Sequence, residues 1–453
     1  MEKEAGIRVA IAGAGLTGLT TAFYLKKRGI PFQVFEKSDR TGGVIQTHHE
    51  NGFTFEAGPN TGLLSRPEVV ELLEDLQDEC TVEVADQSAR SRWIWKKNKW
   101  VPLPSGVKSG VTTPLFTFSD KLRLLGEPFR KKGDDPNETL AGLVLRRMGR
   151  SFLNYAIDPF ILGIYSGDPA RLVTQYAFPK LYWLEQDYGS FIGGAFKKAK
   201  EPISERDKKA TKEIFSVKGG LVNLIASLEK KIGKENITLG CSSLSFQKKT
   251  DKYYTSFDNE GFSHVISTVG SYELETLFPF ITEKQFEPLK KLQYSRVVQV
   301  ALGFKNWSGM PLKAFGGLVP FIEQRRILGV LFLSSFLKDK APAGGALMSV
   351  FLGGVRRQEI SELNDDEIYS IVEDELTEML RPESFTPDLF KVFRYDHAIP
   401  QYSFESEEKL KAIKDVENTF PGLILGGNIR DGIGIADRIN QGRTIASQLI
   451  DKV

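Results

Sequence analysis

The stretch Gly13-Ala14-Gly15-Leu16-Thr17-Gly18 decides the fold of this chain. It follows a short apolar run, Ile7–Ala12, and it opens a segment, Leu16–Arg28, whose apolar residues recur with a helical period. A glycine ends that segment, and a second apolar run, Pro31–Glu36, begins soon after it. We therefore predict a strand, a helix and a second strand within about thirty residues, with the two strands parallel.

Each glycine of this stretch meets a separate need of a dinucleotide-binding turn. Gly13 permits the tight turn, Gly15 lets the backbone approach a pyrophosphate, and Gly18 lets the helix pack closely on the strand. The N-terminus of the helix then offers free N–H groups and a partial positive charge to the phosphates. Glu36, at the end of the second strand, is placed to accept hydrogen bonds from ribose hydroxyls. The pattern predicts a Rossmann-type nucleotide site.

Three further glycine-rich regions favour FAD over NAD as the nucleotide. Arg40-Thr41-Gly42-Gly43 follows Glu36, where FAD enzymes continue their phosphate and ribitol contacts, and Glu56–Thr61 is a tight loop of the kind that runs beneath a flavin ring. Gly426–Asn428 and Gly432–Ile435 open onto the last helix, whose N-terminus would stabilise an anionic reduced ring. We predict FAD bound without a covalent link. The predicted FAD contacts are Gly13, Ala14, Gly15, Leu16, Thr17, Gly18, Glu36, Lys37, Arg40, Gly42, Gly43, Gly58, Pro59, Asn60, Thr61, Leu244, Asn428, Ile433, Gly434 and Ile435.

The 453 residues are too many for one simple core, so several lobes are expected. We predict an α/β fold in which a discontinuous Rossmann-type FAD-binding domain comprises residues 1–62, 213–272 and 419–453. A mixed α+β substrate-binding domain takes residues 63–86, 185–212 and 273–418, and a mainly helical lobe takes 87–184. Short strands are expected at Ile237–Leu239, Leu244–Phe246, His264–Thr268, Gln299–Phe304, Ile327–Phe332, Ala346–Phe351 and Leu423–Gly427.

Charge and cysteine content exclude several classes of function. The formal net charge of +2 speaks against binding nucleic acid through bulk charge. Two distant cysteines and four histidines give no disulfide framework and no metal site. The first residues lack the pattern of a secretory signal, and no apolar run reaches the length of a membrane span. We expect a cytoplasmic protein, free or peripherally attached to a membrane.

The basic stretch from Arg90 to Lys132 leaves two interpretations open. It contains three of the five tryptophans, and Arg92–Leu103 alternates like a hairpin that turns near Asn98. Lysine and arginine side chains near anionic headgroups, with tryptophans at the interface, would attach the protein peripherally to the cytoplasmic face of a membrane. The alternative is a solvated hairpin with core tryptophans. The sequence also leaves open whether the chain is a monomer or a homodimer.

Four stretches outside the flavin loops carry a resemblance that spans the whole chain. They are Arg92–Trp95 running to Pro102-Leu103-Pro104, Asp158–Pro169, Phe315–Pro320 with Leu328-Gly329 and Ser334–Phe336, and Ala398-Ile399-Pro400-Gln401-Tyr402. On these residues the chain resembles the protoporphyrinogen oxidase and coproporphyrinogen III oxidase family of the FAD-dependent amine-oxidase superfamily. The resemblance implies an FAD domain, a substrate domain and a helical lobe that touches the membrane.

The same resemblance implies a reaction and a substrate site. A porphyrinogen would lose six electrons in three two-electron steps of haem biosynthesis, with oxygen as acceptor and hydrogen peroxide as product. Arg92 would face a propionate of the substrate, whereas its alternative role is to stack on neighbouring tryptophans. Gly163 would line the cavity, whereas its alternative role is a simple helix break. Because no catalytic triad or carboxylate pair is found, no catalytic residue beyond the flavin is predicted.

Several alternatives remain at this point. The sequence does not decide between protoporphyrinogen IX, which has two propionates, and coproporphyrinogen III, which has four. The number of cations in the cavity would distinguish them, and the sequence does not show which residues line that cavity. An amine oxidase or a carotenoid-type desaturase could use the same scaffold. A non-catalytic flavin-fold binding protein, like the Rab escort and GDP-dissociation-inhibitor group, is the alternative from another class. The intact glycine pattern and Glu36 speak against it.

Overall fold

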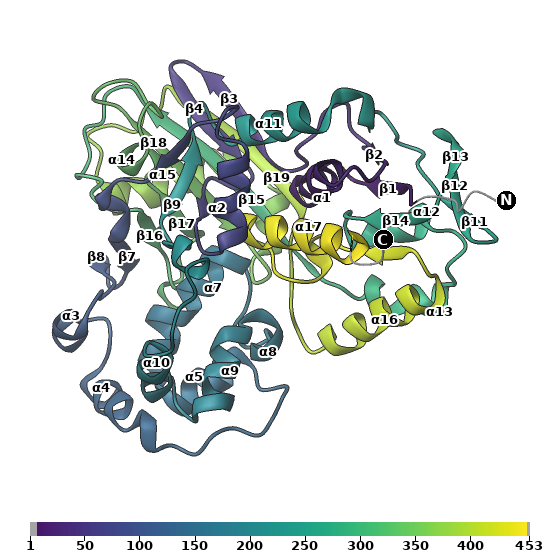
Figure 1. The fold of residues 1–453 in the computed structure, drawn as a ribbon. Coiled ribbons are helices and arrows are strands. Elements are labelled where there is room, and N and C mark those ends of the chain that lie inside the picture. The colour runs from purple at the N-terminus through teal and green to yellow at the C-terminus, as the bar shows by residue number, and fades with distance from the viewer. Residues whose placement is uncertain (1–6, 451–453) are drawn as a thin grey trace.

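The computed structural model describes residues 7–450 and places the predicted strand–helix–strand unit inside a parallel sheet (Figure 1). β1 (Val9–Ala12) pairs in parallel with β2 (Phe32–Phe35), and α1 (Leu16–Lys27) connects them. The sheet draws its strands from the start, the middle and the end of the chain, as the sequence predicts. Its order is β10 (Ile237–Thr238), β2, β1, β14 (His264–Ser267) and β20 (Leu423–Leu425), and all pairs are parallel.

This sheet is buried on both faces because alternate residues of β1 enter two different cores. Val9 and Ile11 pack against four helices on one side, whereas Ala10 and Ala12 pack on the other side against a small sheet and three helices. The strands of a sheet that is covered on both faces have continuous apolar sequences. On the first side lie α1, α2 (Pro67–Asp75), α11 (Val222–Ile232) and α17 (Ile435–Ile450); on the second lie β11 (Gln247–Lys249), β12 (Lys252–Thr255), β13 (Asp258–Phe262), α12 (Leu274–Leu277), α13 (Glu283–Lys290) and α16 (Ser406–Thr419).

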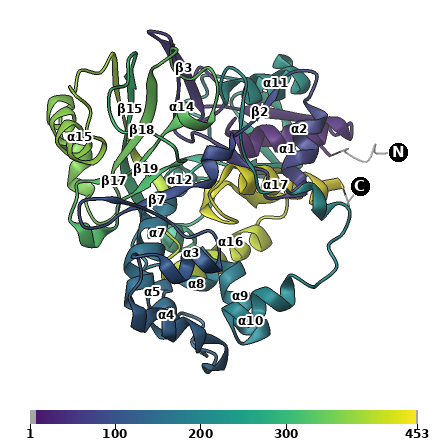
Figure 2. The same cartoon turned by 90° about the vertical axis from the view of Figure 1, so that its left-hand side faces the viewer.

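A seven-stranded mixed sheet forms the second large layer (Figure 2). One of its faces packs on the long helix α15 (Asp365–Leu380), which supplies much of the apolar core there. The opposite face turns toward the parallel sheet and the helical lobe. The order is β19 (Leu389–Pro400), β15 (Tyr294–Phe304), β18 (Ala346–Gly353), β17 (Ile327–Leu331), β16 (Gly316–Leu318), β7 (Arg92–Trp95) and β8 (Trp100–Pro102), in which only β16 and β7 pair in parallel.

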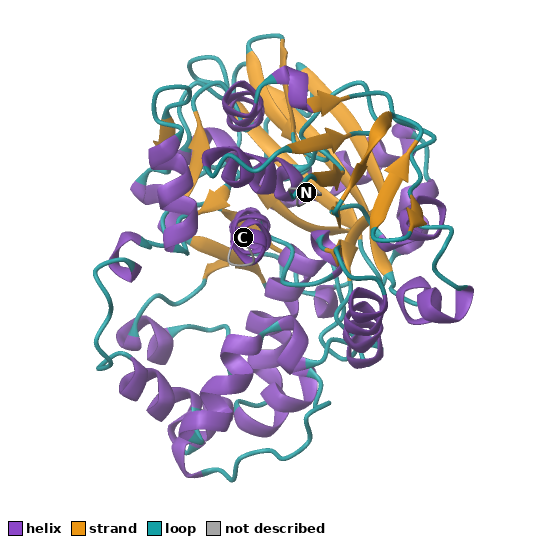
Figure 3. Ribbon diagram, turned by 45° about the vertical axis from the view of Figure 1, so that its right-hand side comes forward, coloured by secondary structure: helices purple, strands orange, loops and turns teal. Residues whose placement is uncertain are grey.

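Helices and loops alone form the lower lobe in Figure 3. A π-helical turn, Leu153–Ile157, joins two of its helices directly before Pro159, whose ring nitrogen has no N–H to donate. The lobe helices are α3 (Val107–Thr112), α4 (Phe118–Leu125), α5 (Leu140–Arg147), α6 (Arg150–Phe152), α7 (Asp158–Tyr165), α8 (Thr174–Ala177), α9 (Pro179–Tyr188) and α10 (Phe191–Lys198). Smaller elements are β3 (Gln46–Glu50) with β4 (Phe53–Ala57), α14 (Leu333–Phe336), and β5 (Gly62–Leu63), β9 (Ile214–Val217) and β6 (Val82–Val84) in one sheet.

The hairpin at residues 92–103 forms as predicted, but its tryptophans are not at a membrane interface. The chain turns at Lys97 and Asn98, whose φ values of 49° and 57° suit a tight hairpin turn. Trp93, Trp95 and Trp100 pack in the core beneath α15. Of the two interpretations that the sequence leaves open, the hairpin with core tryptophans is the one observed, because strand alternation directs these side chains to the α15 side of the sheet.

Four large exposed apolar side chains of the lobe lie on α4 and the turn after it. Phe118, Leu122, Leu125 and Phe129 follow a helical spacing, and Phe129 is 91% exposed. Within residues 7–450, none of the helices has the length and apolar character needed to cross a bilayer.

The predicted strand at Leu244–Phe246 is wrong. These residues form an irregular connection, and β11 begins after them at Gln247. Phe246 is fully buried between the rings of Phe35 and Phe278, so the apolar run reflects a core contact of a loop.

Candidate active site

The glycine turn after β1 leaves the N-terminus of α1 open. Gly13 has a φ of +101°, and a Cβ on Gly18 would lie 2.0 Å from the Gly13 carbonyl oxygen. Only glycine permits this close approach. Gly15 precedes the helix with no side-chain cap, and a Cβ there would meet nothing within 4 Å. The first N–H groups of α1 therefore face open space, which suits an anion.

Glu36 lies beside this turn at the end of β2. Its buried carboxylate accepts hydrogen bonds from the Ala14 N–H at 2.7 Å and the Ser38 N–H at 3.0 Å. The next side chain, Lys37, pairs with Glu273 at 3.0 Å near the surface. The carboxylate of Glu36 is thus fixed at the edge where β1, β2 and the glycine turn meet.

The loop Arg40–Gly43 packs directly onto the glycine turn. The Gly42 N–H donates to the Ala14 carbonyl at 2.8 Å, and a Cβ on Gly43 would lie 3.4 Å from the Cα of Gly15. The Arg40 guanidinium donates to the carbonyls of Thr41 and Gly43 within its own loop. In this structure Arg40 braces the loop.

Gln299 fixes the loop Glu56–Thr61 to the mixed sheet. The loop turns at Gly58, whose φ is +92° and where a Cβ would lie 2.3 Å from the Val44 carbonyl oxygen. The Gln299 side chain, 1% exposed, accepts from the Gly58 N–H and donates to the Glu56 carbonyl, both at 2.9 Å. Its amide also donates to the Ser349 hydroxyl at 2.9 Å. A satisfied buried network of this kind holds a loop rigidly.

A second brace holds the C-terminal loop between β20 and α17. Gln441 accepts from the Gly427 N–H at 2.8 Å, and Arg438 donates to the Gly432 carbonyl at 2.8 Å. The Tyr402 hydroxyl accepts from the Gly432 N–H at 3.2 Å and lies 3.3 Å from the carbonyl oxygens of Asn428 and Gly432. Burial raises the pKa of the Tyr402 phenol, so it stays protonated and can donate to them.

The other predicted contacts lie around the same edge of the parallel sheet or beside it. Leu244 donates its N–H to Cys241, whose N–H donates to the Glu36 carbonyl, so this turn adjoins β2. Ile433 packs in the lobe core near Tyr402, and the Gly434 carbonyl accepts from the first turn of α17.

Among the described residues, one buried polar atom next to the glycine turn and one in the loop Glu56–Thr61 have no hydrogen-bond partner. They are the Thr17 hydroxyl in the first turn of α1 and the side-chain oxygen of Asn60. A buried polar atom without a partner is unfavourable, so an external group is expected to complete each one. With the open face at Gly15, these atoms fit a ligand that carries phosphates and hydroxyl or N–H groups.

Arg92 and Gly163 lie toward the same face of the mixed sheet, the one that packs against the lobe. Arg92 and Ile94 point the same way on β7, and Ile94 packs with the lobe. Leu318 is registered with Ile94 and therefore shares this face. A Cβ on Gly163 would lie 2.7 Å from the Cδ2 of Leu318.

The exposed face of α7 is entirely apolar. Phe160, Gly163 and Ile164 are exposed, whereas Ile161, Leu162 and Tyr165 are buried. Such a face beside Leu318 offers a flat apolar surface at the junction of lobe and sheet.

The Arg92 guanidinium forms no ion pair or hydrogen bond with any residue between 7 and 450. It lies 5.3 Å from the ring centroid of Phe315, so its aromatic neighbour is a phenylalanine and not one of the tryptophans. Burial lowers the pKa of the guanidinium, although it stays charged at neutral pH. A half-buried cation without a partner is a candidate anion-binding group.

The stretch Ala398–Tyr402 holds the stretch Asp158–Pro169 in place. The buried amide of Gln401 donates to the Tyr165 carbonyl at 3.0 Å, and the Val173 N–H donates to the Tyr402 carbonyl at 2.9 Å. The residues that carry the resemblance thus lie in one contiguous region.

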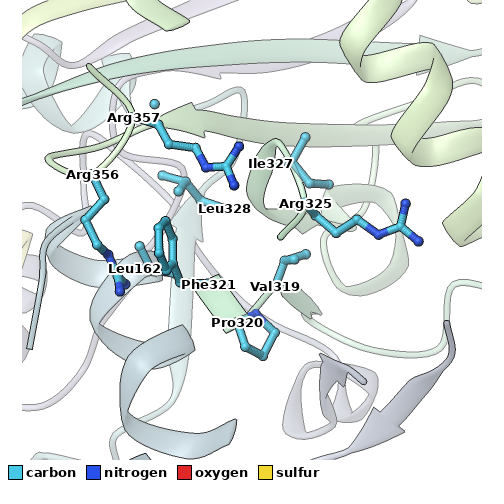
Figure 4. Close-up of a pocket in the computed structure, with 10 residues that line it drawn as sticks. Leu162, Val319, Pro320, Phe321, Arg325, Ile327, Leu328, Arg356 and Arg357 are labelled. Carbon is cyan, nitrogen blue, oxygen red and sulfur yellow. The ribbon is translucent and has the colours of Figure 1, made fainter. Parts of the chain in front are cut away.

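A small cavity behind α7 is not this site. Figure 4 shows Arg356 and Arg357 around Phe321, with Leu162 on the lobe side. Its volume of about 10 Å³ has room for one water at most. Asp158 pairs with Arg356 there and accepts from the Phe321 N–H at 2.8 Å, which ties α7 to the sheet.

Comparison with known families decides the class of the protein. The family described as flavin containing amine oxidoreductase matches residues 16–450. The chain belongs to this family. Protoporphyrinogen oxidase 2 of Arabidopsis thaliana is 29% identical to this chain, over 99% of this chain and 95% of that protein. Coproporphyrinogen III oxidase of Bacillus subtilis is 26% identical, over 98% and 97% of the two chains.

A solved structure of a candidate protoporphyrinogen oxidase from Exiguobacterium sp. 255-15 has the same fold, with a TM-score of 0.82 at 20% identity and full coverage of both chains. The resemblance seen in the sequence is confirmed, and the protein is a flavin-dependent oxidoreductase.

Three polar residues of the site were not predicted from the sequence, namely Gln299, Arg438 and Gln441. Each acts through contacts with residues distant along the chain or in an adjoining loop, and none belongs to a glycine motif. A buried amide or guanidinium in an otherwise apolar strand or helix is the one signal that could have marked them.

Proposed function

We propose that this oxidoreductase binds FAD non-covalently and oxidises a porphyrinogen to a porphyrin in haem biosynthesis. The substrate would be protoporphyrinogen IX or coproporphyrinogen III. Six electrons and six protons would leave the macrocycle in three two-electron steps, and each step would reduce one oxygen molecule to hydrogen peroxide. The partner-free guanidinium of Arg92, on the sheet face that packs against the lobe, carries this proposal. The names of the relatives support it.

The proposed cofactor contacts are those predicted from the sequence, with the open N-terminus of α1 for the pyrophosphate and Glu36 for the ribose. Bound FAD would supply the two-electron chemistry. Thr17 and Asn60 would complete their hydrogen bonds on the cofactor. The division into an FAD-binding domain, a substrate-binding domain and a helical lobe at the predicted boundaries belongs to the same proposal.

The residues of the chain would bind and orient the substrate. Arg92 would pair with a propionate at the edge of the macrocycle. The absence of a side chain at Gly163 and the flat surface of Leu318, Phe160 and Ile164 would admit the macrocycle and exclude water.

An aerobic assay with both porphyrinogens, followed by porphyrin fluorescence, tests the function. We expect porphyrin to form faster than by autoxidation and hydrogen peroxide to accumulate with it. No porphyrin above autoxidation with either substrate would refute the proposal. A colourless sample that takes up no added FAD would favour a non-catalytic binding protein. A difference in rate between the two substrates identifies the preferred one.

We further propose that the lobe attaches peripherally to a membrane through Phe118, Leu122, Leu125 and Phe129. Exposed apolar side chains in a helical stripe gain free energy by entering a bilayer interface. We expect sedimentation with vesicles that contain an anionic lipid, and about a tenfold weaker partition for the double variant Phe118→Ser, Leu125→Ser.

Phe404→Ser is the matched control for membrane binding, because Phe404 is an exposed phenylalanine outside the α4 stripe. It should sediment like the unchanged protein. Equal sedimentation of all three proteins would remove the α4 stripe from any membrane contact.

A further inference from the structure

Lys409 holds a buried positive charge that no neighbour neutralises. It lies on α16 with 1% of its surface exposed. Its Nζ forms no hydrogen bond or ion pair with any residue from 7 to 450. An unpaired buried ammonium destabilises a folded protein, so this lysine is expected to serve a purpose other than stability.

The ammonium lies directly behind the tyrosine that holds the C-terminal loop. Lys409 Nζ is 4.5 Å from the ring centroid of Tyr402. The hydroxyl of the same tyrosine contacts both the N–H and the carbonyl of Gly432, as well as the carbonyl of Asn428. Tyr402 therefore contacts both the charge and the loop.

The other charged groups around Lys409 already interact with other residues. Burial lowers the pKa of Lys409 to about 8, and the Asp431 carboxylate opposes that shift. Asp431 itself accepts from Gln441 at 2.8 Å and lies 3.6 Å from the Arg430 guanidinium. From α17, Arg438 acts on Tyr402 and is bonded to the loop carbonyls. One turn before Lys409, at the N-cap of α16, Glu405 accepts from the Ser403 hydroxyl.

We propose that Lys409 is a positioning residue whose fixed charge, acting through Tyr402 and the C-terminal loop, favours the reduced, anionic state of the flavin held by that loop. This inference rests on the flavin site proposed above. The charge would add to the partial positive charge at the N-terminus of α17. Buried charges act over several ångströms because little solvent screens them.

The reduction potential of the bound flavin tests this role directly. At pH 7 we expect the preference for reduced over oxidised flavin to be at least tenfold weaker in Lys409→Met than in the unchanged protein. This lowers the two-electron reduction potential of the flavin by at least about 30 mV. The reduction potential of Lys409→Arg should stay close to that of the unchanged protein. Lys411→Met, an exposed charge change two residues along α16, should leave it unchanged. At pH 9.5 the difference from the unchanged protein should vanish, because Lys409 has then lost its proton.

Urea unfolding without flavin gives a second, independent readout. Because the folded-state pKa of Lys409 is depressed, its destabilising effect is complete below pH 8 and fades as the pH rises toward 10.5. Flavin-free Lys409→Met should therefore be more stable than the unchanged protein at pH 7, with the gap closing at higher pH.

A less stable flavin-free Lys409→Met would show a merely structural lysine and overturn the inference. If Lys409→Met binds flavin with an unchanged reduction potential, the inference is also overturned, while the proposed function stays intact. An unchanged protein that binds no flavin would refute the proposed function and this inference together.

Discussion

Gly15→Ala should weaken FAD binding about a hundredfold, or 2–3 kcal/mol, while the flavin-free protein stays as stable as before. The added methyl would meet no atom within 4 Å, and the φ of −74° at Gly15 suits any residue, so folding is not affected. The methyl would instead occupy the space through which a pyrophosphate approaches the first N–H groups of α1. Titration of the flavin-free protein with FAD, followed by fluorescence quenching, measures the affinity, and thermal unfolding measures stability.

Gly18→Ala is the contrasting variant within the same turn. Its methyl would lie 2.0 Å from the Gly13 carbonyl oxygen, a backbone atom that has little room to move. This variant should lose stability, by about 3 kcal/mol or more, together with FAD binding. Unaltered affinity in Gly15→Ala would exclude the α1 N-terminus as the pyrophosphate site.

Arg92→Ala should raise the apparent KM for a porphyrinogen by roughly 10- to 100-fold, as expected for loss of a hydrogen bond to a charged group. The guanidinium has no partner within the described residues, so its removal breaks no internal contact except the one with Phe315. Flavin content should not change, because Arg92 lies on the sheet face next to the lobe and away from the glycine turn. Initial rates at several substrate concentrations, with flavin absorbance on the same samples, provide the measurement.

Arg296→Ala is the matched control for Arg92. Arg296 belongs to the same sheet, but it makes a surface pair with Glu362, which contributes little free energy. Its KM should match that of the unchanged protein. An equal KM for Arg92→Ala would remove Arg92 from the substrate site.

The sequence predicted the parallel sheet well because local rules govern it. Gly13, Gly18 and Gly58 stand where the backbone needs a positive φ or a close approach, and such needs are visible in the residue type itself. The continuous apolar runs of β1 and β2 likewise reveal strands buried on both faces.

Other features could not be predicted from the sequence because they depend on contacts between distant residues. The tryptophans of the hairpin face α15, which follows them by more than two hundred residues in the sequence. Gln299 and Lys409 look like ordinary polar residues until the fold places one against Gly58 and the other behind Tyr402. Apolar residues at Leu244–Phe246 fit a strand as well as a buried loop, and only the packing of Phe246 distinguishes the two.

The order of strands in the parallel sheet also constrains how the chain reaches its native state. During synthesis β1 and β2 are made before the other strands of this sheet, β14 joins them much later, and β20 is the last of the five to be made. Until then the apolar edge of β1 has no permanent neighbour, and pairing between segments so distant in the chain is intrinsically slow. The N-terminal unit therefore carries an apolar strand edge that stays unpaired until β14 has been made.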